Sequence, residues 1–95
     1  MTTVYVCQKC DGHKRLMRFL RAETAASLRG VGCQKVCRQP VAGLTVNGRL
    51  EWFCRLDSPK RLVAVARLIA DEGRGRLPTT LEKSRSRDRS GRPPR

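Results

Sequence analysis

Two closely spaced cysteine pairs constrain this chain more than any other feature of its sequence. The first pair is Cys7-x2-Cys10 and the second is Cys33-x3-Cys37. Thiolates at such spacings can reach one metal centre without straining the backbone, and thiolate is a preferred ligand of zinc and of iron–sulfur clusters. Two pairs in a chain of 95 residues are therefore a much stronger metal signal than one pair. The alternative is that the cysteines are two sets of small buried hydrophobes.

The composition changes sharply after Gly73. Residues 74–95 are rich in Arg, Ser, Gly and Pro and poor in apolar side chains, so we expect a disordered basic tail after a folded domain at 1–73. A core made from the remaining residues is small, and such domains often need a metal or disulfides for stability. Because the tail contains no cysteine, we expect its removal to leave the metal site intact.

The N-terminus and the charge bear on compartment and partners. Residues 1–6 lack the basic and apolar regions of a signal peptide, and no apolar run is long enough to cross a membrane. We therefore expect a cytoplasmic protein, in which thiols stay reduced and serve as ligands. A net charge of +13 could attract an acidic partner protein, nucleic acid bound through the basic tail, or an anionic membrane surface, and it specifies none of them. Few aromatic residues are available for base stacking.

The N-terminal half predicts a strand, a helix and a weak second strand. The β-branched run Thr2–Val6 predicts a strand that delivers Cys7 at its end. From Lys14 the apolar residues recur at helical spacing, which predicts a helix that extends to about Leu28. Only a weak strand signal, at residues 29–32, precedes the second cysteine pair.

The C-terminal half predicts a hairpin and a second helix. Asn47-Gly48 between two apolar runs is a strong hairpin signal, because both turn positions favour φ > 0. In the return strand, 49–56, strict alternation predicts an apolar face with Leu50, Trp52, Cys54 and Leu56 and an opposite face with Arg49, Glu51, Phe53 and Arg55. We therefore expect Cys54 to be a buried core thiol, away from both cysteine loops. Ser58-Pro59 predicts the start of the helix and Gly73 its end.

These elements favour a small α/β domain with a central sheet, a β-hairpin and two packed helices. The chain resembles the thioredoxin-like [2Fe-2S] ferredoxins, which include the Shethna-type ferredoxins and the small cluster-bearing subunit of NADH dehydrogenases. It also resembles a group of short bacterial proteins described as predicted metal-binding proteins. The matching features are the first strand ending in Cys7, Cys33-x3-Cys37, Pro40, the strand to Val46, Asn47-Gly48, the return strand and Ser58-Pro59. In the ferredoxins ten or more residues usually separate the first two cysteines, whereas here two do.

The resemblance implies a thioredoxin-like fold and a [2Fe-2S] cluster on Cys7, Cys10, Cys33 and Cys37. Such a protein is a one-electron carrier rather than an enzyme, and its redox partner would have an acidic docking surface. Two other functions stay open. The four thiolates could hold a structural zinc ion in a domain that binds nucleic acid or an acidic partner. Alternatively, Cys7-x2-Cys10 could be the redox pair of a thiol–disulfide oxidoreductase. His13, the only histidine, is an alternative ligand to Cys10, although a solvent-exposed loop histidine is the simpler interpretation.

Overall fold

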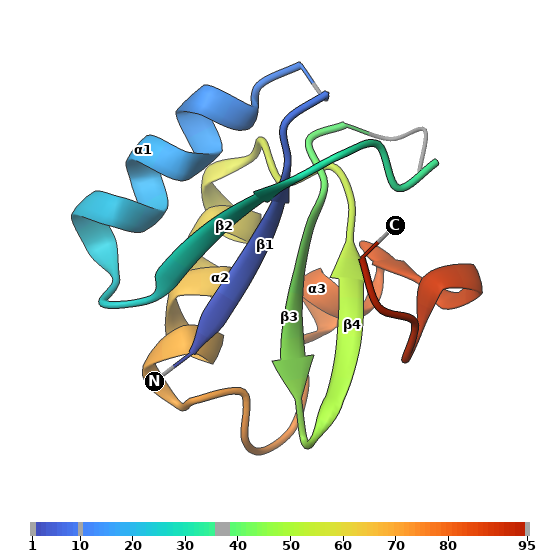
Figure 1. Cartoon of the computed structure of the whole chain (residues 1–95). Helices are drawn as coiled ribbons and strands as arrows, with labels where there is room; N and C mark the ends of the chain where they lie inside the picture. The colour runs from blue at the N-terminus through green and yellow to red at the C-terminus, as the bar shows by residue number, and fades with distance from the viewer. Residues whose placement is uncertain (1, 10, 36–38, 95) are drawn as a thin grey trace.

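The chain folds around a five-stranded mixed sheet. The computed structural model describes residues 2–9, 11–35 and 39–94. The strand order is β2-β1-β3-β4-β5 (Figure 1). β1 and β2 are parallel, and the remaining neighbours are antiparallel. The strands are β1 (Thr3–Cys7), β2 (Ser27–Val31), β3 (Ala42–Val46), β4 (Arg49–Phe53) and β5 (Arg85–Ser86). The predicted α/β class with a central sheet and hairpin is confirmed.

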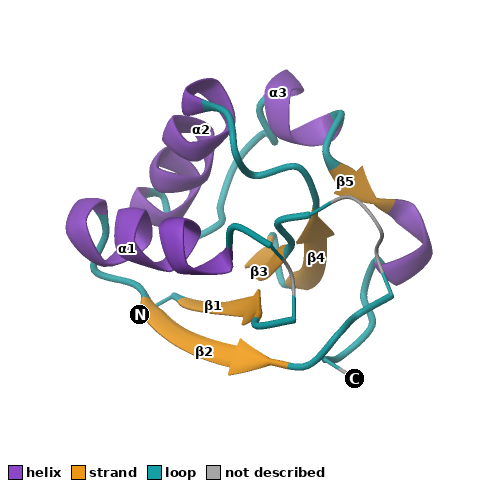
Figure 2. Ribbon diagram, turned by 90° about the horizontal axis from the view of Figure 1, so that it is seen from above, coloured by secondary structure: helices purple, strands orange, loops and turns teal. Residues whose placement is uncertain are grey.

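All the α-helices lie on one side of this sheet, as Figure 2 shows. They are α1 (His13–Glu23), α2 (Pro59–Ala70) and the short α3 (Thr79–Glu82). Leu16 and Leu20 of α1 and Leu62 and Val65 of α2 pack in the main core with the inward side chains of β1, β3 and β4. Over the described part of the chain, no helix combines the length and the apolar character needed to cross a membrane.

Two local signals predicted element boundaries correctly. Asn47 and Gly48 have φ values of 50° and 83°, so they form the hairpin turn between β3 and β4 as predicted. Ser58 caps α2, because its Oγ accepts a hydrogen bond of 3.3 Å from the Arg61 N–H. Pro59 is the first helical residue, where a missing N–H costs nothing. In both places interactions between neighbouring residues determine the backbone conformation.

Helix α1 is shorter than predicted. It ends at Glu23, because Thr24 adopts an extended backbone while its N–H and hydroxyl both donate to the Leu20 carbonyl oxygen. The chain then enters β2, in which Leu28 is paired with Val4 of β1. The weakly predicted strand is therefore confirmed, although it begins two residues earlier than residue 29. Its register comes from β1 rather than from its own sequence.

The predicted alternation of β4 is confirmed up to Cys54, although both faces are covered, and it fails at Leu56. Glu51 and Phe53 are buried, and Phe53 belongs to the main core under the helices. Leu56 also joins that core, because Arg55, with a φ of 55°, interrupts the alternation after β4 ends. Trp52 and Cys54 lie on the opposite face. Alternation assumes that one face meets water, whereas here both faces of β4 are covered.

The structure differs from the sequence prediction of a disordered tail at 74–95. It places α3, β5 and the 3-10 helix η1 (Arg87–Arg89) in this segment. Leu81 is fully buried in the main core. Residues 84–94, called the C-terminal strap below, then pass round the β4 edge to the sheet face away from the helices (Figure 2). The Trp52 indole N–H donates to the Arg92 carbonyl oxygen at 3.0 Å, which fixes the strap on that face.

Candidate metal centre

Cys7 lies at the carboxyl end of β1 and is 1 % exposed. Its N–H donates to the Val41 carbonyl oxygen at 3.1 Å, beside the start of β3. Its side chain belongs to an apolar cluster with Val41, Trp52 and Cys54 on the sheet face under the C-terminal strap. Cys7 is therefore shielded from water by a rigid strand end and by aromatic and aliphatic neighbours.

Cys33 lies two residues beyond the end of β2 and is exposed. Because β1 and β2 are parallel and Cys7 is paired with Val31, the loops that carry the two predicted cysteine pairs start side by side. The Lys35 N–H donates to the Cys33 sulfur at 3.3 Å, in a turn where Lys35 has a φ of 58°. Hydrogen bonds from backbone N–H groups to a ligand sulfur are a known means of tuning an iron–sulfur site.

The two cysteine loops also meet at their far ends. The Asp11 N–H donates to the Gln39 side-chain oxygen at 2.7 Å. A methyl group placed on Gly12 would lie 3.6 Å from the Pro40 ring, so the backbone there approaches the proline closely. The peptide bond between Gln39 and Pro40 is cis. The flanks of both predicted pairs therefore come together at one end of the sheet.

Two of the four predicted ligands, Cys10 and Cys37, lie outside the described residues. Within the described ranges no group of three or more His, Cys, Asp or Glu side chains could hold a metal ion. The structure thus places Cys7 and Cys33 on adjacent strand ends, and the four-thiolate site as a whole stays a prediction. A set of four thiolates suits an iron–sulfur cluster and a structural zinc ion alike.

His13 differs in position from its sequence-based description. It is the first residue of α1 rather than a loop residue, and it is half-buried. Gln8, Lys14, Met17 and Arg18 line the same shallow groove beside it. The cationic neighbours disfavour an additional positive ion at this position, so the groove supports His13 poorly as a replacement for Cys10.

Sequence reasoning missed a buried pair next to Cys33. The Gln34 side chain is 1 % exposed, and its oxygen accepts a hydrogen bond of 2.9 Å from the Arg89 guanidinium. Arg89, 8 % exposed, also donates to the Pro93 carbonyl oxygen and lies 5.7 Å from the centre of the Trp52 ring. The strap thus places the buried guanidinium of Arg89 against Gln34, the residue after Cys33. No sequence signal separates Arg89 from the other arginines of the tail.

Cys54 is buried, as predicted, but it is not remote from the cysteine loops. It shares the apolar cluster of Cys7, with Val41 between them across the sheet. Its sulfur donates to the Ser84 carbonyl oxygen at 3.2 Å, and its backbone N–H donates to the same oxygen at 2.8 Å. Both contacts fit a structural thiol that anchors the start of the C-terminal strap.

We expect Cys54→Ala to keep its metal and to lose about 1–2 kcal/mol of unfolding free energy, from lost packing and a lost hydrogen bond. Metal content and urea unfolding measure the two effects. Cys33→Ala, compared in the metal-free protein, is the matched control: its side chain is exposed, so stability should change by less than about 0.5 kcal/mol. Loss of metal from Cys54→Ala would make Cys54 a ligand.

In comparisons with known proteins, no protein-family model, curated protein or solved structure matches the chain.

Proposed function

We propose that this chain is a [2Fe-2S] iron–sulfur protein that carries one electron at a time, with Cys7, Cys10, Cys33 and Cys37 as the cluster ligands. The observation that carries the proposal is the meeting of the two cysteine loops. They start at the adjacent ends of parallel strands β1 and β2, and the contact between Asp11 and Gln39 joins them again. Four thiolates from two such loops are the number that a [2Fe-2S] cluster needs.

The surroundings of Cys7 and Cys33 support an electron-transfer role. The apolar cluster around Cys7 excludes water, and the Lys35 N–H donates to the Cys33 sulfur. The buried Arg89 guanidinium is hydrogen-bonded to Gln34, the residue after Cys33, and its positive charge would favour the negative thiolates of the proposed cluster. When bound, the cluster supplies one-electron redox chemistry, and the protein needs no substrate pocket for it. We therefore propose a carrier rather than an enzyme.

We further propose that the domain is thioredoxin-like. The support is the strand order β2-β1-β3-β4, with β1 and β2 parallel and the hairpin antiparallel, together with α1 and α2 on one face. The thiol–disulfide alternative has less support. Cys7 is buried at a strand end, and α1 begins only at His13, so the helix N-terminus that would activate a thiol comes six residues later.

The proposed partner is a redox protein with an acidic docking surface, in the cytoplasm. The net charge of +13 supports an anionic partner, and such an association should weaken as salt rises. Nucleic acid is the other anion that this charge would attract.

The identity of the metal is the experiment that tests this function. Protein purified without oxygen should be red-brown, should bleach on reduction and should contain about two irons and two sulfides per chain. Stoichiometric zinc without iron, after anaerobic isolation and reconstitution, would end the electron-transfer proposal and favour a structural zinc site. Disulfide reduction by a metal-free protein would favour the oxidoreductase.

Serine at each proposed ligand position in turn should alter or abolish the visible spectrum, because each variant removes one of four thiolates. The control is Cys54→Ala, whose spectrum should match that of the parent protein. An unchanged spectrum in Cys10→Ser would remove Cys10 from the ligand set and leave its place to His13 or water.

A further inference from the structure

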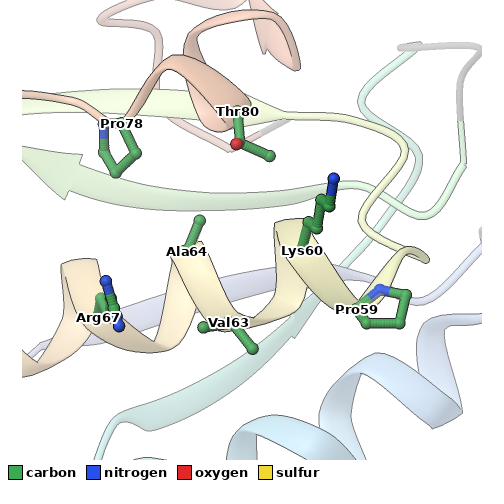
Figure 3. A pocket seen from close by; sticks show the side chains of 7 residues that line it. All are labelled: Pro59, Lys60, Val63, Ala64, Arg67, Pro78 and Thr80. Atoms are coloured by element: carbon green, nitrogen blue, oxygen red, sulfur yellow. The ribbon is translucent and has the colours of Figure 1, made fainter.

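A shallow groove lies along α2. It has a volume of about 470 Å³ and lies between α2 and the segment around α3. Figure 3 shows Ala64 on the side of α2 that faces Pro78 and Thr80, with Lys60 and Arg67 toward opposite ends. The remaining lining residues are Pro59 and Val63. The groove is therefore apolar along its length and cationic at both ends.

Val63 marks this groove as a contact surface. Among the described residues it is the large hydrophobic side chain that stands exposed, at 49 %. It lies three residues after Lys60 and four before Arg67, so the three side chains share one stripe of the helix. An exposed apolar side chain between charged residues has the composition of a small protein–protein interface, with an apolar centre and a polar rim.

The charges of the groove select its partner. Both charged lining residues, Lys60 and Arg67, are cations, and neither forms an ion pair with an acidic side chain of the described chain. They lie seven positions apart, a rise of about 10.5 Å along α2. A partner helix with two carboxylates seven residues apart presents the same spacing, and an apolar residue between them would reach the exposed Val63.

We propose that this groove docks an acidic amphipathic helix of a partner protein, with two carboxylates that pair with Lys60 and Arg67 and an apolar side chain that packs on Val63. The binding mode is that of an amphipathic helix in a groove. The partner class follows from the groove alone. The further statement that this partner is a redox protein rests on the proposed function. The position of the groove supports it, because α2 begins at the end of the sheet that carries the cysteine loops. There the Leu56 N–H donates to the Pro40 carbonyl oxygen at 3.2 Å.

The test is a titration of the ¹⁵N-labelled full chain with a helical probe peptide of about 15 residues that carries two Glu residues seven positions apart and Leu between them. Chemical-shift changes should group on Lys60, Val63, Ala64, Arg67 and Thr80. A second peptide, with both Glu residues replaced by Lys, should bind at least about tenfold more weakly. Shift changes spread evenly over the basic surface would overturn the proposal.

Matched variants separate the groove from net charge. Lys60→Glu/Arg67→Glu should weaken binding of the Glu peptide by at least about tenfold, and so should Val63→Asp, which places a charge at an exposed position. Arg18→Glu/Arg21→Glu makes the same change in net charge on the exposed face of α1 and should change affinity by less than about threefold. Equal losses in the two double variants would overturn the proposal.

Two further measurements distinguish other outcomes. An oligothymidine probe of about 15 nucleotides that shifts the same groove residues more strongly than the peptide would replace the protein partner with nucleic acid, and so overturn the proposal. The peptide titration is repeated on protein with and without bound metal. Peptide binding with and without metal supports the docking proposal whatever metal analysis finds. Absence of peptide binding in both states overturns the docking proposal and leaves the proposed metal centre untouched.

Discussion

Truncation after Gly73 is expected to lower the unfolding free energy by about 3–5 kcal/mol or more. Leu81, 0 % exposed, would leave the main core, and the Trp52 indole would lose its cover and its hydrogen bond to the strap. Urea unfolding measures the loss. Trp52 is the only tryptophan, so its fluorescence should also shift to the red as water reaches the ring.

The truncated protein is also expected to lose metal faster than the full chain, contrary to the expectation from sequence that the tail is dispensable. The reason is the Arg89–Gln34 hydrogen bond, which ties the strap to the residue after Cys33. Chelator challenge of the two proteins measures the metal loss. Arg89→Ala should reproduce part of it, whereas Arg87→Ala, at an exposed position two residues earlier, should not. Equal unfolding midpoints and equal emission of truncated and full chains would show that residues 74–95 contribute no stability.

The parts of the fold that the sequence predicted correctly are those with a local cause. The hairpin follows from Asn47 and Gly48 alone, since their backbone preference does not depend on the rest of the chain. The start of α2 follows from Ser58 and Pro59 for the same reason. For the candidate site, the order of strand, helix and strand was enough to bring Cys7 and Cys33 to one end of the sheet.

What the sequence did not predict depends on distant partners. The strap has no apolar periodicity, and its order comes from contacts such as the hydrogen bond of 2.7 Å from the Gly91 N–H to the Leu50 carbonyl oxygen. The Arg89 guanidinium is buried because neutral oxygens and an aromatic face receive it, and composition cannot reveal such partners. The burial of Glu51 was not foreseen for the same reason, since the Ser90 hydroxyl of the strap donates to its carboxylate.

The turn after α2 holds the helix against the hairpin, and Gly73 is its central residue. The Gly73 N–H donates to the Leu68 carbonyl oxygen and the Glu72 N–H to that of Ile69, which is the hydrogen-bond pattern of a Schellman motif. The Gly73 carbonyl oxygen accepts a bond of 2.8 Å from the Asn47 N–H. This one residue therefore connects the end of α2, and with it the proposed docking groove, to the β3–β4 turn.

Gly73→Ala is expected to destabilise the domain by about 3 kcal/mol or more. A Cβ at this position would lie 2.0 Å from the Thr45 carbonyl oxygen, so the turn must move away from β3. The φ of 72° adds a cost of about 1–2 kcal/mol for any residue with a side chain. Urea unfolding of the full chain measures the change.

The neighbouring residue provides the matched control. Glu72 has a φ of 54° and is exposed, so Glu72→Gly should remove strain without removing a packed group. Its ion pair with Arg74, 3.9 Å long and at the surface, contributes little. We expect a gain of about 0.5–1 kcal/mol from this substitution. A loss of unfolding free energy in Gly73→Ala together with a gain in Glu72→Gly would locate the constraint in the contact between Gly73 and Thr45. A Gly73→Ala variant as stable as the parent protein would show that this contact does not hold α2 against the hairpin.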